Sequence, residues 1–329
     1  MKTLVADDVF LNHAFNSANF ALVPAHKIEE KEIYSIGRHY LFNEDEVSYL
    51  FKNGYAIRYI RPCELFLLER GAIVLFNEEP SKLNEFLLQD YLVADSEKYD
   101  FYSLHTFMNA FLHKNFIPPS FCIRTFFYNN KIKGFPSLFS MVKRSMDIFF
   151  SIIGLSILCV IFPFIALIIK IQSQGPIFFV QKRVGINGKE FDCLKFRTMH
   201  VNNDEALFSA GSEDSRIFPF AHFMRKTRID EFPQFLNVLL GEMSLIGPRP
   251  ERRVWTEQFE KTIPYYNKRH LVKPGITGLA QVLYRYGANE YDAKQKLMYD
   301  LYYIEEHSAW LEIRIFFKTI TVILNRKGK

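Results

Sequence analysis

The sequence predicts an α+β protein in which a small α/β N-terminal domain precedes a domain built around a re-entrant membrane helix. Three features indicate this fold. Residues 1 to about 135 mix strand-like and helix-like segments, residues 148–169 form an uncharged apolar run, and hairpin and amphipathic-helix patterns follow that run. Two domains are the natural expectation for 329 residues. We therefore expect one domain over residues 1–135 and a second over residues 136–329.

The composition favours a membrane surface or a phosphorylated ligand as partner. Hydrophobic residues make up 49% of the chain, aromatic residues 16%, and the net charge is +5. No signature of a nucleic-acid-binding module is present, so nucleic acid is not an expected partner. The four cysteines lack CxxC spacing, which predicts reduced, buried thiols. The first residues are acidic where a signal peptide is basic, so we expect no export signal.

The N-terminal domain is predicted from short alternating elements. Tyr55–Ile60 and Ala72–Phe76 have the composition of strands, and Ser81–Leu92 and Tyr102–Leu112 have apolar residues at helical spacing. Glycine-rich phosphate loops, metal-ligand clusters and nucleophile motifs are missing from this part of the sequence. We therefore assign it no chemistry, and Lys131–Pro136 is the expected linker to the second domain.

The apolar run 148–169 is long enough to enter a membrane, since a helix of this length would measure roughly 33 Å. Pro163 lies inside the run and should kink or break the helix. Lys143 and Arg144 precede the run and Lys170 follows it, and such basic flanks prefer the cytoplasmic side. A re-entrant helix that turns near Pro163 satisfies both features, with Lys143 and Arg144 at lipid head groups.

Two other structures for this run stay open. A one-pass anchor would place the N-terminal domain outside the cell, and a buried core helix would leave the membrane out altogether. Labelling cysteines placed at residues 100 and 300 would separate the first two, because a re-entrant helix keeps both positions on the cytoplasmic side.

A basic hairpin should follow the membrane helix. Ile177–Val180 and Glu190–Phe196 have strand character, and Asn187-Gly188 between them is a strong hairpin turn. Four cations lie on or beside this hairpin: Lys182, Arg183, Lys195 and Arg197. Strand residues two apart point the same way, so we expect Lys195 and Arg197 to share a face. These cations could contact lipid head groups or form a cationic wall for a pyrophosphate.

The most informative stretch is RKTRIDEFPQFLNVLLGEMSLIGPRPE, which begins at Arg225. Apolar residues after the acidic pair Asp230–Glu231 recur at helical spacing, and Pro233 fits only the first turn of that helix. The acids therefore lie at a helix start, which attracts phosphate. One interpretation is that they only cap the helix. A chemical role would also account for the basic run on one side and the Gly-Pro-Arg-Pro turn on the other.

Three ordered motifs in this sequence resemble a known family. QKRVGINGKEFDCLKFRTM, then RKTRIDEFPQFLNVLLGEMSLIGPRPE, then KPGITGLAQV are similar to the bacterial sugar transferase domain of the polyprenyl-phosphate phosphoglycosyl transferases. The resemblance covers roughly residues 142–325, and the C-terminal part is similar to the branch associated with exopolysaccharide synthesis. The chain departs from the family pattern at Phe162, Lys273 and Leu279, where a small polar residue, an arginine and a tryptophan are common.

The resemblance implies a sugar-1-phosphate transferase at the bacterial inner membrane, with its catalytic domain in the cytoplasm. Such an enzyme moves a sugar 1-phosphate from a UDP-sugar to polyprenyl (undecaprenyl) phosphate and releases UMP. Asp230 would be the nucleophile and would contact Mg²⁺, with Glu231 assisting. Phosphate-binding residues implied by the motifs or expected from the basic hairpin are Arg225, Lys195, Arg197, Lys182, Arg183, Arg249 and Lys273.

The chemistry expected from these residues follows from charge. A carboxylate that attacks phosphorus approaches an anion, and two unit charges about 4 Å apart repel by about 1 kcal/mol in water and more near a protein. Cations and Mg²⁺ would offset this repulsion. Two rival functions stay open: a non-catalytic scaffold in a polysaccharide assembly complex, and a phosphohydrolase that uses the same acids. Homo-oligomers and downstream glycosyltransferases are further partners to test.

Overall fold

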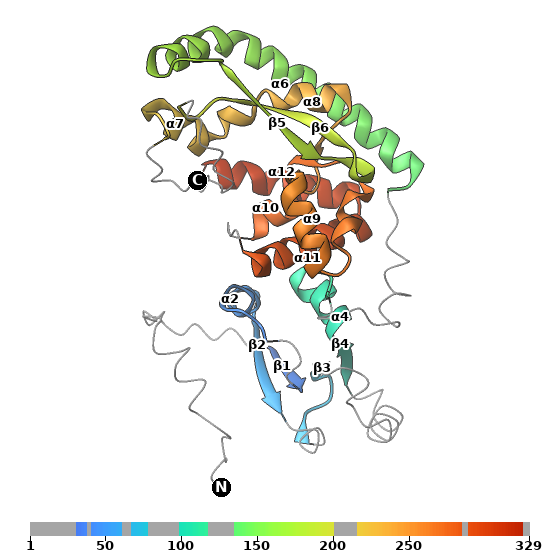
Figure 1. Cartoon of the computed structure of the whole chain (residues 1–329). Helices are drawn as coiled ribbons and strands as arrows, with labels where there is room; N and C mark the ends of the chain where they lie inside the picture. Colours follow the sequence, from blue (N-terminus) through green and yellow to red (C-terminus); the bar gives the residue numbers. More distant parts are fainter. Residues whose placement is uncertain are drawn as a thin grey trace. The chain divides into compact units, whose positions relative to one another are not determined.

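The structure is a computed structural model that describes residues 31–37, 41–60, 67–77, 99–117, 135–200, 216–284 and 289–324. The chain divides into two compact units, Met1–Phe101 and Tyr102–Lys329. Both contain helices and strands (Figure 1), so the predicted mixture of helix and sheet is confirmed. The predicted domain boundary near residue 135 stays a prediction, although the contacts group residues 102–117 with the second unit.

The first unit is a four-stranded sheet with strand order β2-β1-β3-β4. Its elements are β1 (Lys31–Ile36), α2 (Glu44–Lys52), β2 (Tyr55–Ile60), β3 (Ile73–Phe76) and β4 (Asp100–Ser103). Strand β1 pairs in parallel with both β2 and β3, and Ile36, Val74 and Tyr99 form a small buried cluster. The strands predicted at Tyr55–Ile60 and Ala72–Phe76 are confirmed, whereas the predicted helix Ser81–Leu92 lies outside the described residues.

The second unit begins with a short helical segment that packs on a later helix. The segment consists of α4 (Leu104–Phe107) and the π-helical turn η2 (Met108–Leu112), where a helix was predicted. The buried Lys114 donates from Nζ to Gln295 Oε1 at 2.7 Å, and the backbone N–H of Asn115 donates to the carbonyl of Met298. Both acceptors belong to α11 (Glu290–Glu305), so this segment is part of the second unit's core.

Helix α6 (Ser137–Gln172) contains the apolar run and extends beyond it at both ends. Pro163 lies inside this one helix, so the predicted break there is wrong. Figure 1 shows α6 as a single long helix that curves along its length. Among the described residues it is the one helix long and apolar enough to cross a membrane. Only 22% of its most apolar window is buried, so the structure does not support a buried core helix.

The predicted hairpin after α6 is confirmed. Strands β5 (Phe178–Val184) and β6 (Glu190–Phe196) pair antiparallel, and the 3₁₀ turn η3 (Ile186–Gly188) joins them. Asn187 (φ 54°) and Gly188 (φ 72°) occupy the left-handed region in this turn. Asparagine and glycine tolerate that region best, which explains why this dipeptide predicted the turn.

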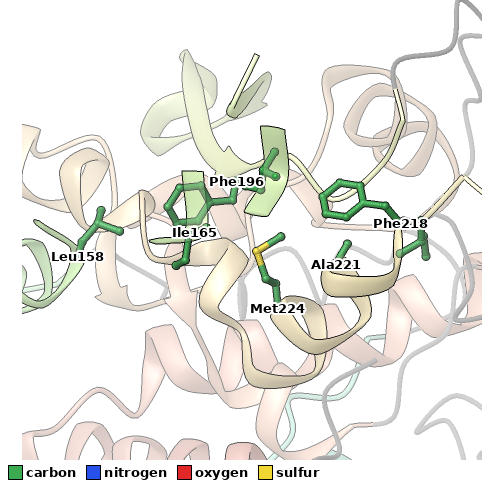
Figure 2. Close-up of a cluster of buried hydrophobic side chains, with 8 residues drawn as sticks. Leu158, Ile165, Phe196, Phe218, Ala221 and Met224 are labelled. Atoms are coloured by element: carbon green, nitrogen blue, oxygen red, sulfur yellow. The ribbon is translucent and has the colours of Figure 1, made fainter. Parts of the chain in front are cut away.

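A buried apolar cluster fixes the second half of α6 to the hairpin and to α7 (Pro219–Thr227). Figure 2 shows Leu158 and Ile165 from α6, Phe196 from β6, and Phe218, Ala221 and Met224 at and within α7. The ring of Phe162 stacks on Phe178 with centroids 5.6 Å apart, and Phe178 stacks on Phe196 at 5.5 Å. Burying a large apolar side chain contributes about 1.5–3 kcal/mol, so this cluster holds the end of α6 firmly.

The remaining elements of the second unit are short until the last two helices. They are η4 (Ile229–Glu231), α8 (Gln234–Leu240), β7 (Ser244–Ile246), α9 (Arg253–Thr262), η5 (Tyr266–Leu271), β8 (Gly275–Thr277), α10 (Leu279–Leu283), α11 and α12 (Ala309–Leu324). Residues 306–308 separate α11 from α12. Cys193 is buried as predicted, whereas Cys159 is exposed on α6, contrary to the prediction.

Candidate active site

The acidic pair lies in a 3₁₀ turn between two helices rather than in the first turn of α8. Helix α7 ends at Arg228, whose backbone is left-handed (φ 59°), and η4 then carries Asp230 and Glu231 before α8 begins at Gln234. A non-glycine residue pays roughly 1–2 kcal/mol for this conformation. Both acids of this turn are buried.

One carboxylate oxygen of Glu231 contacts three cationic side chains from three parts of the chain. Oε1 lies 2.9 Å from Arg249 Nη2, 3.2 Å from Lys195 Nζ and 3.6 Å from Arg228 Nη1. Burial alone would raise the pKa of Glu231, but these cations overcome it and hold the pKa below its usual value. Glu231 is therefore ionised and serves as the fixed centre of a cationic cluster.

Asp230 has the opposite environment. Its Oδ1 is buried and accepts no hydrogen bond from any residue that the structure describes. Burial, followed by the charge of Glu231, raises the pKa of Asp230 from 3.8 to about 6, against the opposing effect of the three cations. Buried carboxylate oxygens normally have partners. An oxygen without one beside a cationic cluster is positioned for a metal ion or for a reacting atom.

The backbone around Arg249 is held at almost every carbonyl. The carbonyl of Pro248 accepts from Gly275 N, that of Arg249 from Arg269 Nη2, and that of Pro250 from Arg183 Nη1. The carbonyls of Ile246 and Glu251, on either side, accept from Tyr303 Oη and Val184 N. The Gly-Pro-Arg-Pro turn is therefore rigid, and it presents the Arg249 side chain to Glu231.

The KPGITG motif supports this turn through close backbone packing. A Cβ at Gly275 would lie 2.1 Å from Gly247 N, and one at Gly278 would lie 2.2 Å from Gly247 O. Only glycine allows backbones to approach this closely. Lys273 at the start of the motif lies beside Gly241 and Arg144, near the C-terminal end of α8. Lys273 therefore lies beside the C-terminal end of α8. Its contact with phosphate stays a prediction.

The structure gives protein partners to three hairpin cations, and one of them contradicts the shared face expected for Lys195 and Arg197. Arg197 follows the end of β6, is buried, and donates to the carbonyls of Ser173 and Gln174, so it does not join Lys195 at the acidic pair. Alternation along the strand stops applying where the strand ends. Lys182 pairs with Asp192 at 3.3 Å, with both side chains more than half exposed. Arg183 lies inward and contacts the chain next to Arg249.

The two predicted head-group residues have protein partners. Arg144 donates from Nη1 and Nη2 to the carbonyls of Val238 and Leu239, the last turn of α8, at 2.6 and 2.7 Å. A cation at a helix C-terminus satisfies carbonyls that have no partner within the helix. Lys143 pairs with Glu312 of α12 at 2.7 Å, and its side chain is only 11% exposed. Both cations therefore anchor α6 to the protein, and their predicted contact with lipid head groups stays a prediction.

Some site residues were not singled out from the sequence. Arg228 was visible only as one member of a basic run, and nothing in the local pattern pointed to Arg269. Asp147 of α6 accepts from Ser244 Oγ at 2.8 Å and from Leu245 N at 2.9 Å, which ties α6 to β7. A lone acid beside an apolar run was the available signal for Asp147. Arg225, in the last turn of α7, precedes the pair with one guanidinium nitrogen shielded from solvent.

These features define a class of site: a buried carboxylate pair, one member ionised and one with an open oxygen, within a cationic cluster beside a long apolar helix. Comparison with known proteins gives the family. The model of the bacterial sugar transferase family matches residues 138–326, and the chain belongs to this family.

Several curated relatives align with the same part of the chain. It is 44% identical over 193 residues to a UDP-N-acetylgalactosamine-undecaprenyl-phosphate N-acetylgalactosaminephosphotransferase of Aeromonas hydrophila, covering 58% of this chain and 45% of the relative. It is 40% identical over 183 residues to the UDP-glucose:undecaprenyl-phosphate glucose-1-phosphate transferase of Escherichia coli K12, covering 55% and 39%.

A shorter relative matches over nearly its whole length. The exopolysaccharide production protein PSS of Rhizobium leguminosarum is 38% identical over 193 residues, covering 56% of this chain and 96% of the relative. By contrast, the chain spans less than half the length of the two transferases above. The likeness is therefore to the transferase part of those longer proteins.

Proposed function

We propose that this protein transfers a sugar 1-phosphate from a UDP-sugar to polyprenyl phosphate and releases UMP. Family membership supports the reaction class, and the names of the relatives support both the nucleotide sugar and the lipid phosphate. The observation that carries the proposal is the contrast within the acidic pair. Glu231 Oε1 is engaged by cations, while Asp230 Oδ1 is buried and accepts no hydrogen bond from the described residues.

The first step is a displacement at the phosphorus that carries the sugar. An Asp230 carboxylate oxygen forms a bond to this phosphorus, the bond to the bridging oxygen breaks, and UMP leaves with the electron pair. The product is an aspartyl phosphosugar. With a pKa of about 6, Asp230 is mostly ionised at pH 7.5 and is still more basic than an exposed aspartate.

The cationic cluster stabilises the negative charge in this step. Lys195, Arg228 and Arg249 are held by Glu231, yet their side chains are 21%, 36% and 33% exposed, so part of each faces the solvent. Preorganised cations reduce the barrier because they need no reorganisation as charge moves to the leaving oxygen. We assign Glu231 the role of positioning these cations.

In the second step an oxygen of polyprenyl phosphate attacks the same phosphorus. The bond to Asp230 breaks, the carboxylate is restored, and a polyprenyl diphosphosugar leaves. Dividing the reaction in this way lets one site serve a water-soluble donor first and a membrane-bound acceptor later.

The residues fit Mg²⁺ bound through Asp230. No group of three or more potential metal ligands occurs among the described residues. However, Mg²⁺ needs only one or two protein carboxylates when phosphate oxygens complete its coordination. The open Oδ1 of Asp230 suits this arrangement, whereas Glu231 Oε1 is already engaged by cations. Bound Mg²⁺ would neutralise pyrophosphate charge.

The contacts of α6 support a re-entrant position in the membrane. Near its start, Lys143 and Arg144 bind α12 and α8, and at its end Gln172 Oε1 accepts from Phe220 N of α7. Because elements of one unit hold both ends, a one-pass span would have to carry part of that unit across the hydrocarbon core. Apolar side chains are exposed along α6 and α12, among them Phe149, Phe164, Leu167, Trp310 and Phe317.

We propose that these exposed side chains enter the cytoplasmic leaflet of the inner membrane. The topology can be tested by labelling single cysteines at the exposed positions Asp100 and Glu290 in intact cells, with the native cysteines replaced. A membrane-impermeant reagent should label neither position until the cells are opened. Labelling of the residue-100 cysteine from outside would reject the re-entrant arrangement.

The function is tested by incubating the purified full-length protein with UDP-glucose, UDP-galactose and UDP-N-acetylgalactosamine, with and without undecaprenyl phosphate. We expect one equivalent of UMP per active site without the lipid and continued turnover with it. No UMP from any donor would favour the scaffold alternative. Continued turnover without the lipid would favour the phosphohydrolase.

A further inference from the structure

A buried ion pair lies behind the turn that carries Arg249. Arg269 of η5 and Asp300 of α11 have side chains only 5% and 2% exposed, and Nη2 of Arg269 lies 2.8 Å from Oδ2 of Asp300. The same Nη2 donates to the backbone carbonyl of Arg249 at 3.0 Å, and Nη1 donates to the hydroxyl of Tyr266 at 2.6 Å. One guanidinium therefore joins α11, η5 and the Gly-Pro-Arg-Pro turn.

Stability alone does not explain this pair. Burying two charges costs several kcal/mol of desolvation for each ion, and apolar residues often serve equally well in such places. What an apolar pair could not provide is a donor to the Arg249 carbonyl in a fixed direction. A lysine could not provide all three contacts either, because its single ammonium lacks the planar fork.

We propose that Arg269 and Asp300 are positioning residues that fix the backbone at Arg249 and so keep its guanidinium on Glu231. This inference rests on the proposed function. Three direct contacts connect them to the site: Asp300 to Arg269, Arg269 to the Arg249 carbonyl, and Arg249 Nη2 to Glu231 Oε1 at 2.9 Å.

The same helix holds the other end of the turn. Tyr303 of α11 donates from its hydroxyl to the carbonyl of Ile246 at 3.1 Å, three residues before Arg249. Helix α11 thus supports the turn directly at Ile246 and, through Arg269, at Arg249. Losing the second contact frees the carbonyl of the residue whose side chain meets Glu231. A misplacement of about 1 Å at a reacting centre can cost about 100-fold in rate.

The test uses full-length protein in lipid nanodiscs and the UDP-sugar that the wild type turns over. In single-turnover reactions at saturating donor, Arg269→Lys and Asp300→Asn should each slow UMP release about 10- to 100-fold, with little change in the donor concentration for half-maximal rate. In an Arg249→Ala background, Arg269→Lys should cost less than about 3-fold, because residues that act through one another are not additive.

Lys114→Met is the matched control. It removes a buried contact to the same helix α11, through Gln295, that does not lead to Arg249. Its effect on the rate should be small and should multiply with that of Arg249→Ala. Hydrogen–deuterium exchange supplies a readout that does not depend on activity. The amides of residues 244–251 should exchange faster in Asp300→Asn than in wild type, and at the wild-type rate in Lys114→Met.

The outcomes separate the two claims. If wild type releases no UMP, the proposed function fails and this inference fails with it. Suppose that wild type is active. If Arg269→Lys keeps the wild-type rate, or if the rate losses of Arg269→Lys and Arg249→Ala multiply fully in the double variant, the positioning role alone is overturned. Should Arg269→Lys fail to fold, Asp300→Asn carries the same comparison, and unchanged exchange at residues 244–251 would also overturn the role.

Discussion

Removing the carboxylate of Asp230 should stabilise the protein, although it abolishes the proposed chemistry. Raising the pKa of Asp230 from 3.8 to about 6 costs the ionised form about 3 kcal/mol, at about 1.4 kcal/mol per unit. Below about pH 3 the group is protonated in both the folded and the unfolded protein, so the free energy of unfolding is unaffected. As the pH rises to about 6 the unfolded state loses its proton first, and the folded protein is destabilised.

The assay compares the stability of wild type and Asp230→Asn across this pH range. Relative to wild type, the variant should gain about 2.5 kcal/mol between pH 4 and pH 7, which corresponds to roughly 4 °C in melting temperature for a chain of 329 residues. The measurement is made in nanodiscs with EDTA, since a bound cation would lower the pKa of Asp230 and mask the effect.

Asp192→Asn serves as the control, because Asp192 lies on the hairpin with its side chain 58% exposed. Its substitution should change the melting temperature little, and equally at both pH values. The reasoning is refuted if Asp230→Asn gains no stability over wild type between pH 4 and pH 7. Adding Mg²⁺ should reduce the advantage of the variant, since wild type alone binds the cation through this carboxylate.

Four further substitutions test the site and its support. Glu231→Gln should slow UMP release about 100-fold, measured in a single turnover, because three cations lose their shared acceptor. Arg144→Met should cost about 1–3 kcal/mol of stability through two lost carbonyl contacts, whereas Lys182→Ala at an exposed pair should cost under about 1 kcal/mol in the same melting assay. Gly154→Ala puts a methyl group 2.7 Å from the Phe235 ring and should cost about 1–3 kcal/mol, seen as a lower melting temperature; a wild-type melting curve would contradict this packing.

Local patterns predicted the elements whose cause is local. The hairpin followed from an Asn-Gly turn between strand-like runs, and residues 187 and 188 adopt the left-handed conformations that this dipeptide favours. The long apolar helix followed from its uninterrupted composition. Continuity through Pro163 could not be predicted in the same way, because packing on the hairpin and α7 holds both sides of the proline in one helix.

The acidic pair was predicted from its neighbours in the sequence, but its division of roles was not. The carboxylate that the cations engage is decided by Lys195 and Arg249. These residues lie 36 and 18 residues from Glu231 in the sequence and contact it only in the folded chain. For the same reason the protein partners of Arg144 and Arg197 could not be predicted. Their charge suggested lipid or phosphate, whereas folding gives them backbone carbonyls at the ends of α8 and α6.

The central claim is that Asp230 forms a covalent bond to the phosphorus of a sugar phosphate before the lipid acceptor does. Intact-protein and peptide mass spectrometry after rapid acid quench, with UDP-sugar present and lipid absent, measures this directly. The account predicts one phosphosugar per chain, located at residue 230 and absent from Asp230→Asn. An active wild-type protein that carries no such adduct, or carries it in the variant as well, would contradict the account.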